Sequence, residues 1–393
     1  MMLHSLNAST SFRKREFDMD IKKNKAKTFV NYMLQLANIN INGQTPWDIQ
    51  IYNDEFYSRL LRDADLGLGE SYMEGWWDCQ RIDLFISKLI NANLESKIKI
   101  NFKLAFNVFL SKILNLQTPK RSLHVGRQHY DRGNDLFQIM LDSNMNYTCG
   151  YWKKAENLEQ AQLDKLDLAC RKLCLKPGMK LLDIGCGWGG LAKYAAENYG
   201  VSVVGITISQ QQYELAKTRC AHLPVEIRFQ DYRDLNEKFD RIVSLGMFEH
   251  VGYKNYRKYM EIVHQCLNDD GLFLLHTIGS NESVTKATPW ISKYIFPNGM
   301  IPSIMQIGQA SEKLFVMEDW HNFGADYYKT LMAWHENFNQ GWEQIKSQYS
   351  EKFFRMWNYY LLSCAGAFDA RMLQLWQIVF SKKGIQGGYS APR

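Results

Sequence analysis

The stretch KLLDIGCGWGGLAKYAAENYG, residues 180–200, decides the fold. Its apolar start predicts a buried strand that ends near Asp183, and the residues after the glycines have the composition of a helix. Gly185, Gly187 and Gly190 satisfy the spacing G-x-G-x-x-G. Glycines between a strand and a helix allow a tight turn and let a ligand approach the backbone closely. The sequence therefore predicts a nucleotide-type loop at the carboxyl end of a strand.

Short apolar runs and helical stretches alternate on both sides of this loop. Strands are predicted over 180–185, 201–209, 225–231, 239–246 and 271–279, and helices over 189–200 and 210–221. This alternation is typical of a parallel sheet with helices on both faces. We expect an α/β, doubly wound, Rossmann-like catalytic domain over 121–393, preceded by a flexible tail over 1–27 and a smaller, mainly helical N-terminal domain over 28–120.

The composition is that of a globular protein. The chain has 393 residues, of which 46% are hydrophobic and 22% are charged, so disorder over the whole chain is excluded. No apolar run reaches the roughly 18–20 residues of a membrane span, and the N-terminus lacks the apolar core of a signal peptide, so we expect a cytoplasmic protein. None of the eight cysteines forms a C-x-x-C pair, and we predict no metal site.

Residues 86–121 carry most of the excess positive charge. This segment has seven basic residues and one acid, against a net charge of +6 for the chain. Apolar residues alternate with the lysines, as in a helix that lies on an anionic membrane surface. A helix that packs on its own domain with its lysines in water has the same pattern. Both interpretations stay open, and the first predicts peripheral contact with the inner face of the membrane.

The ligand of the glycine loop follows from the neighbouring strands. A dinucleotide site usually has an acid at the end of the second strand to hold a ribose, and here that strand ends VVGITIS, without an acid. Asp183 instead stands just before the first glycine. The resulting D-x-G-x-G-x-G form resembles class I S-adenosylmethionine-dependent methyltransferases, in which QDYRDL (230–235) would lie near the adenine.

Several segments together resemble a narrower family, the cyclopropane-fatty-acyl-phospholipid synthases. The resemblance runs from about His124 to Val379 and is looser over 28–120. It rests on HYDRGNDLFQIMLDSNMNYTCGYW (129–152), LLDIGCGWGG (181–190), VVGITIS (203–209), QDYRDL (230–235), SLGMFEHVG (244–252), LLHTIGS (274–280) and WHNFGADYYKTLMAW (320–334).

The resemblance implies an activity and a set of site residues. Methyl transfer from S-adenosylmethionine to a cis double bond of a phospholipid acyl chain would form a cyclopropane ring, and a bound bicarbonate would take the proton. The bicarbonate holders would be Glu249, His276, Tyr327 and the backbone of Cys149 and Ile278, and Cys364 corresponds to a cysteine treated as the family's nucleophile. The cofactor contacts would be Tyr147, Thr148, Asp183, Gly185, Cys186, Gly187, Trp188, Gly189, Thr207, Ile208, Gln212, Tyr232 and Arg233. The family also implies a homodimer.

The chemistry accounts for these residue types. Methylation of an isolated alkene produces a carbocation that water would trap, so the pocket must be dry, and Tyr151, Trp152 and Phe248 are candidates for its walls. A side-chain carboxylate could add to the cation, whereas a small exchangeable base avoids permanent alkylation. Taken alone, His276 would be a buried core histidine. Cys364 in SCAGAF has the surroundings of a small buried helix residue, with no adjacent base.

Other functions share the cofactor loop. Methyl-branching of the acyl chain starts from the same cation, and an N- or O-methyltransferase of a small molecule or a lipid headgroup would use the same cofactor. A catalytically inactive lipid-binding protein is a third interpretation. The N-terminal domain favours a phospholipid over a protein-carried chain. Nucleic-acid methylation is disfavoured, because the basic segment lacks interleaved exposed aromatic residues.

Overall fold

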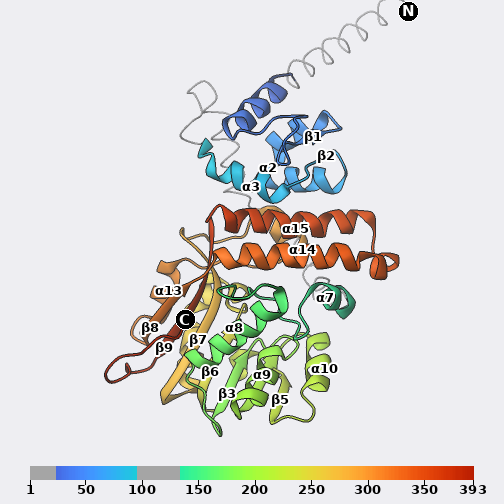
Figure 1. Ribbon diagram of the computed structural model, residues 1–393. Coiled ribbons are helices and arrows are strands. Elements are labelled where there is room, and N and C mark those ends of the chain that lie inside the picture. The colour runs from blue at the N-terminus through green and yellow to red at the C-terminus, as the bar shows by residue number, and fades with distance from the viewer. Residues whose placement is uncertain (1–23, 95–132) are drawn as a thin grey trace, which may run out of the picture. The chain divides into compact units, whose positions relative to one another are not determined.

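The computed structural model describes residues 24–94 and 133–393, which form two compact units (Figure 1). The first unit contains the described residues up to 94 together with Thr288–Trp290 and Glu351–Gly366. The second contains the remainder of residues 133–393. We call them the N-terminal unit and the catalytic unit, and each is described by itself.

The N-terminal unit is mainly helical. It contains a helix over residues 24–36, β1 (Gln50–Ile51), α2 (Glu55–Met73), β2 (Trp77–Asp78) and α3 (Ile82–Asn91). The strands β1 and β2 pair antiparallel. Trp77 is fully buried among aromatic rings, and its indole N–H is 3.0 Å from the Ser71 hydroxyl. This small core holds the short strands against the helices.

Two pieces of the unit come from late in the sequence. Most of α15 (Glu351–Asp369) packs here, because the Arg355 guanidinium donates to the carbonyl oxygens of Tyr72 and Trp77 at 2.6 and 3.1 Å. The Trp290 N–H, in the second piece, donates to the Asp65 carboxylate at 2.9 Å. The expected division into 28–120 and 121–393 differs here, because it assigns 288–290 and 351–366 to the second domain.

Two sequence-based expectations fall wholly or partly outside the described residues. Residues 24–27, assigned to the tail, are helical and Ala26 is buried, while 1–23 lie outside the described part. Of the basic segment, 95–121 is outside it as well. Within the described part, Lys88 lies over the Trp47 ring at 4.4 Å.

The catalytic unit is built on a seven-stranded sheet of order β5-β4-β3-β6-β7-β9-β8. The strands are β3 (Lys180–Ile184), β4 (Ser202–Thr207), β5 (Val225–Phe229), β6 (Phe239–Leu245), β7 (Leu267–Ser280), β8 (Val316–Asn322) and β9 (Leu373–Ser381). The first five of the order are parallel, and β9 runs antiparallel between β7 and β8. The strand order reverses beside β3, which is where doubly wound sheets bind ligands.

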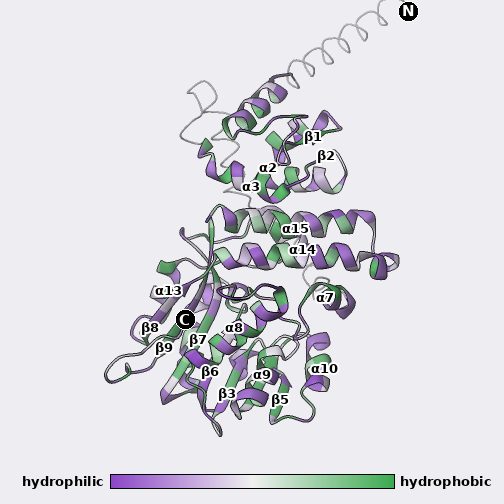
Figure 2. Ribbon diagram, viewed as in Figure 1, coloured by the Kyte–Doolittle hydropathy of each residue, from purple (hydrophilic) through white to green (hydrophobic). Residues whose placement is uncertain are grey.

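Alternate residues of the strands pack on opposite faces of the sheet. Leu181 faces a cluster with α8 (Leu158–Lys172) and α9 (Gly190–Tyr199), and Leu182 faces one with α11 (Tyr256–Cys266) and α13 (Ile304–Ser311). Figure 2 colours much of the sheet as hydrophobic. The other helices are α7 (Asn134–Met140), α10 (Gln210–Arg219), α12 (Pro289–Tyr294), α14 (Ala325–Ile345), η2 (Tyr232–Asp234), η3 (Phe248–His250), η4 (Tyr253–Asn255) and η5 (Lys346–Gln348).

The predicted doubly wound fold is confirmed, and each predicted strand and helix of the loop region is present. The predicted strand over 271–279 belongs to a longer one, β7, and β8 and β9 were not predicted. None of the helices within residues 24–94 and 133–393 combines the length and apolar character that a membrane crossing needs.

Candidate active site

The glycine loop lies at the carboxyl end of β3, as predicted. Gly185 and Gly189 have φ of +80° and Gly187 has φ of +56°, which are left-handed values that favour glycine. A Cβ on Gly185 would lie 2.8 Å from the Met247 side chain. The N–H groups of Gly185 and Cys186 both donate to the Ile206 carbonyl at 3.0 Å, which fastens the loop to β4. The loop is therefore a tight, backbone-lined turn.

The other predicted cofactor residues collect at the same edge of the sheet. Thr207 ends β4 and its hydroxyl donates to Gln212 at 2.8 Å, while the next residue, Ile208, is 71% exposed. Tyr232 and Arg233 form η2 just after β5, and Arg233 pairs with Asp231 at 2.6 Å. An exposed apolar residue beside polar side chains suits an adenosine moiety.

The side chains of Trp188, Cys186 and Tyr147 pack around the loop or are buried next to it. Trp188 is buried, packs on the Phe137 ring at 4.8 Å, and donates its indole N–H to Asn134 at 2.9 Å. Cys186 is buried too. Tyr147 packs on Phe137 at 5.2 Å. Their side chains therefore shape the loop, and any cofactor contact from the loop would come mainly from its backbone.

Two buried ionisable side chains, Asp183 and Lys165, influence each other near the loop. Burial raises the pKa of Asp183 to about 7, against the nearby charge of Lys165, and burial lowers the pKa of Lys165 to about 8. The Lys165 ammonium donates to the Thr148 hydroxyl at 2.9 Å and to Asn146 at 3.3 Å. Lys165 thus connects α8 to Thr148, and the sequence analysis missed it because a helix lysine is normally a surface residue.

Parallel pairing of β6 and β7 brings Glu249 and His276 to one place. Leu245, the last residue of β6, pairs with His276, and Glu249 follows in η3. The Glu249 carboxylate accepts the Ile278 N–H at 2.7 Å. His276 and Ile278 point to the same face of β7, because they are two residues apart. Glu249, His276 and the Ile278 backbone are therefore neighbours, as the resemblance implied.

Both ionisable groups carry a buried atom without a partner. Within the described part of the chain, Glu249 Oε2 and His276 Nε2 have no hydrogen-bond partner. Burial raises the pKa of Glu249 to about 7. Burial and the charges of Lys165 and Lys172 hold the pKa of His276 well below its ordinary value, so the imidazole is neutral. Buried polar atoms are normally satisfied, so these two atoms are available to a polar ligand.

Helix α14 holds the segment that follows Cys149. Thr330 accepts the Gly150 N–H at 3.1 Å and the Trp152 indole N–H at 2.9 Å, and Asp326 accepts the Trp152 backbone N–H at 2.8 Å. Tyr327, also in the first turns of α14, is 8% exposed and packs on Phe368 at 4.5 Å. The loop with Cys149 and the ring of Tyr327 are thus held by one helix.

The predicted aromatic walls differ in their surroundings. Phe248 is fully buried and stacks on Tyr256 at 4.1 Å, so it belongs to the hydrophobic core. Tyr151 packs edge-on against Phe323 at 5.3 Å, and the Phe323 ring is 5.9 Å from that of His276. Ring contacts therefore connect Tyr151 through Phe323 to His276.

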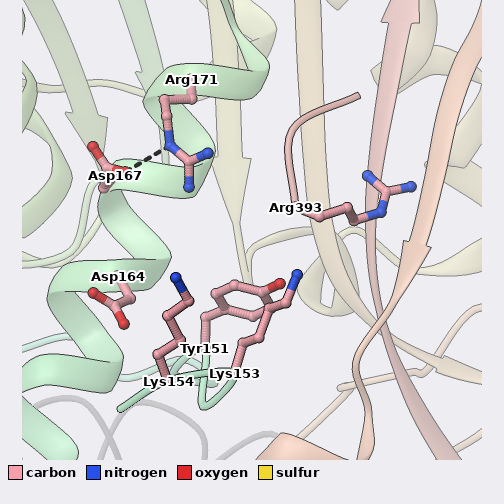
Figure 3. A pocket seen from close by; sticks show the side chains of 7 residues that line it. All are labelled: Tyr151, Lys153, Lys154, Asp164, Asp167, Arg171 and Arg393. Carbon is pink, nitrogen blue, oxygen red and sulfur yellow. Dashed lines mark hydrogen bonds and ion pairs between the residues drawn. The ribbon is translucent and has the colours of Figure 1, made fainter. Parts of the chain in front are cut away.

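A polar pocket of about 280 Å³ lies on the outer side of Tyr151 (Figure 3). It is lined by Tyr151, Lys153, Lys154, Asp164, Asp167, Arg171 and Arg393. Arg171 pairs with Asp167 at 2.7 Å, and Arg393 with Asp319 at 2.5 Å. Because these cations are partly neutralised and the pocket is polar, it does not offer the dry surroundings that a carbocation needs.

The two cysteines predicted at the reaction site, Cys149 and Cys364, are both unreactive in their surroundings. Burial raises the pKa of the Cys149 thiol well above its ordinary value, and its Sγ donates to the Gly150 carbonyl at 3.1 Å. Burial raises the pKa of Cys364 to about 12, and Cys364 belongs to the N-terminal unit, whereas Glu249 and His276 belong to the catalytic unit. A thiolate at either position is disfavoured at neutral pH.

Comparison with known proteins gives consistent relatives. A family profile described as "Mycolic acid cyclopropane synthetase" matches residues 117–378. The chain is 57% identical over 363 residues to the "Cyclopropane-fatty-acyl-phospholipid synthase" of Escherichia coli K12, over 92% of this chain and 95% of that protein. It is 36% identical over 296 residues to a "Probable fatty acid methyltransferase" of Pseudomonas putida, over 70% and 75% of the two chains.

A solved structure shares the catalytic fold. The mycolic acid cyclopropane synthase CmaA1 complexed with SAH and CTAB matches with a TM-score of 0.62 and 32% identity, over 68% of this chain and 99% of that one. The match to the Escherichia coli protein is the longer of the two and covers almost the whole sequence.

Proposed function

Because this chain belongs to the mycolic acid cyclopropane synthetase family, whose members include S-adenosylmethionine-dependent cyclopropane synthases, we propose that its substrate is a membrane phospholipid with an unsaturated acyl chain. The enzyme adds a methylene bridge across the cis double bond. The observation that carries the substrate is the 57% identity over 92% of the chain to a phospholipid-modifying relative, since the CmaA1 structure covers only 68%.

The reaction begins with the π electrons of the alkene. They form a bond to the methyl carbon of the sulfonium while the carbon–sulfur bond breaks, and S-adenosylhomocysteine leaves. The positive charge then lies on the acyl chain. Loss of one proton from the transferred methyl group closes the three-membered ring. If a proton is lost elsewhere, a branched chain results from the same cation, so the position of the base decides the product.

A small anion could take this proton. We propose that bicarbonate is held by Glu249, His276 and Tyr327, with the backbone at Cys149 and Ile278, and that it supplies the exchangeable base. His276 is neutral and buried and has a free ring nitrogen, and Glu249 has a free carboxylate oxygen that accepts an O–H when ionised. The Ile278 N–H is already bonded to Glu249, so its backbone contribution would come from the carbonyl.

We also propose that the enzyme is a homodimer that contacts the inner face of the membrane through its basic segment, 86–121. The support is the excess of six positive charges in that segment. Reversing the charges of Lys97, Lys99, Lys103 and Lys112 should weaken co-flotation with anionic vesicles and leave cofactor affinity unchanged. Undiminished flotation contradicts the docking role, and light scattering of the purified protein tests the dimer.

The reaction is tested with vesicles of an unsaturated phospholipid and S-adenosylmethionine. After hydrolysis of the lipid, proton NMR of the acyl chains should show cyclopropane protons in place of vinyl protons. Activity in buffer freed of carbon dioxide should fall and should return when bicarbonate is added. A methyl gain with the double bond intact contradicts the cyclopropanation, and full activity without bicarbonate contradicts the anion.

A further inference from the structure

Strand β9 places an uncharged polar residue beside His276. Gln377 lies in the apolar run LWQIVF and is fully buried. Antiparallel pairing puts it directly opposite His276 on β7 and opposite His321 on β8. A buried glutamine in a central strand needs a reason, because its amide must be desolvated.

The amide contacts the imidazole itself. Gln377 Nε2 lies 3.3 Å from His276 Nδ1. With the amide in this orientation its nitrogen donates, so Nδ1 is the acceptor and does not carry the proton of a neutral ring. The proton of a neutral His276 then resides on Nε2, which is the buried ring nitrogen without a partner in the described residues.

We propose that Gln377 is a positioning residue that holds His276 as the Nε2–H tautomer, so that the ring presents a hydrogen-bond donor to the anion of the reaction site. The inference rests on the proposed function, because the anion is part of that proposal. The opposite tautomer would present a lone pair to the anion and repel it. Gln377 thus decides whether the same ring attracts or repels the base.

The charged groups around the ring are compatible with a neutral imidazole. Lys165 and Lys172, both on α8, disfavour the second proton that would give the ring a positive charge. Lys172 is itself bonded to Asp319 at 3.1 Å and lies 3.2 Å from His321 Nδ1. Glu249, in η3, accepts the backbone N–H of Ile278, which is two residues after His276 on β7. With a neutral ring, only the choice of tautomer remains, and Gln377 is the residue in contact with Nδ1.

Three variants of the full-length enzyme separate this role from simple packing. In Gln377→Glu the carboxylate can only accept, so Nδ1 must carry the proton. Gln377→Met has similar length and no hydrogen bond. Gln374→Glu is the matched control, because Gln374 is also buried on β9 and accepts from Arg371 at 2.6 Å and Asn322 at 3.0 Å, which a carboxylate can still do. It loses the donation from Gln374 Nε2 to the Arg371 carbonyl at 2.7 Å, just as Gln377→Glu loses the donation to His276.

The first readout is the tautomer itself. In protein with ¹⁵N-labelled histidine, and with the His276 signals assigned by their loss in His276→Asn, wild type should show a protonated Nε2. Gln377→Glu should show a protonated Nδ1 or a charged ring. The second readout is kinetic: the KM for bicarbonate should rise about 10- to 100-fold, the range known for partners that orient metal-bound histidines, with cofactor Kd within about twofold. The KM of Gln377→Met for bicarbonate should lie between those of wild type and Gln377→Glu.

The outcomes separate two failures. An unchanged tautomer and an unchanged bicarbonate KM in Gln377→Glu would overturn the inference, as would an equal effect in Gln374→Glu. A pH profile that shifts upward only in Gln377→Glu supports it, because a carboxylate beside the ring stabilises the charged imidazolium. Wild-type turnover that is independent of bicarbonate would instead contradict the proposed function. This measurement uses the wild-type enzyme alone, so it is separate from the tests on the variants.

Discussion

The two ends of the active site are built in opposite ways. The cofactor end consists of the glycine loop and the residues that follow β4 and β5, and it is made of short contiguous motifs at an open sheet edge, with Ile208 71% exposed. The reaction end consists of Glu249, His276 and Gln377, brought together from three elements, and His276 is only 1% exposed. Binding can rely on backbone and an accessible surface, whereas the reaction needs isolated polar atoms in a dry place.

The strongest test of this contrast is Glu249→Gln, which changes the reaction end alone. The amide keeps an acceptor for the Ile278 N–H but cannot accept an O–H at its other position. Turnover should fall by about 10²- to 10⁴-fold, which is the usual contribution of an acid–base group. Cofactor Kd, measured by calorimetry, should change less than about twofold.

The surface substitution Glu261→Gln serves as the control for this change, because Glu261 pairs with Arg257 on the exposed side of α11. It should leave both turnover and cofactor binding near wild type. If Glu249→Gln weakens cofactor binding as much as turnover, the two ends are not separable and the contrast fails.

The pH dependence distinguishes the ends next. The pKa of Glu249 is raised to about 7, so the carboxylate is protonated below that pH and cannot accept. The value of kcat/KM should therefore fall about tenfold per pH unit as pH drops below 7, because this ratio reports the free enzyme. The same shift makes the native state bind more protons than the unfolded state between about pH 4.5 and 7. Stability from this group is thus lost as pH rises through that window.

The measurement is kcat/KM from pH 5 to 9 together with thermal unfolding in the same buffers. Asp183 also has its pKa raised to about 7 and affects stability in the same direction. The activity limb belongs to Glu249 only if cofactor Kd stays constant across it. A flat kcat/KM profile would show that Glu249 is not the group that must ionise.

At the cofactor end, Gly185→Ala should act on affinity. The alanine would have to adopt φ of +80°, which costs about 1–2 kcal/mol, and its Cβ would lie 2.8 Å from Met247. We expect Kd for S-adenosylhomocysteine to rise about tenfold or more, while kcat at saturating cofactor changes much less. Calorimetric titration measures the first and initial rates the second.

Gly178→Ala provides the matched control for backbone strain. Gly178 precedes β3 with φ of +85°, and a Cβ there would meet no atom within 4 Å. It should lower thermal stability without changing Kd. Equal losses of affinity in both variants would mean that strain in the unit, and not the shape of the loop, sets cofactor binding.

The same contrast explains what could be predicted from sequence. The loop from Asp183 to Gly189 and its flanking strands were predicted within a few residues, because the motif, the apolar runs and the ligand end are contiguous in the chain. The proximity of Glu249 and His276 could be predicted only from the family resemblance, since nothing in the sequence near either residue indicates it. Gln377 did have a local signal, an amide within the apolar run LWQIVF, but its partner is 101 residues away.

The return of α15 to the N-terminal unit could not be predicted from local pattern at all. Arg355 is bonded to backbone oxygens of Tyr72 and Trp77, which are more than 270 residues earlier in the chain. An amphipathic helix near the end of a catalytic domain is predicted to pack on that domain. The pattern defines the apolar face of a helix but not the partner that covers it.

The smallest expected effect concerns Cys364, because burial raises the pKa of its thiol to about 12. A nucleophile must be ionised to attack, and a thiol with this pKa is almost wholly protonated at neutral pH. Methyl transfer from a sulfonium to an alkene also has no step that a nucleophilic sulfur would assist. Cys364→Ala should therefore keep initial rates within about twofold of wild type, with any loss traced to a lower unfolding temperature. Cys364→Ser is the stricter variant, because it places a hydroxyl at a partly buried position and should cost more stability than Cys364→Ala. A 100-fold loss of turnover in both variants, at a temperature where both are folded, would put Cys364 in the reaction and require a second reaction end beside the one formed by Glu249 and His276.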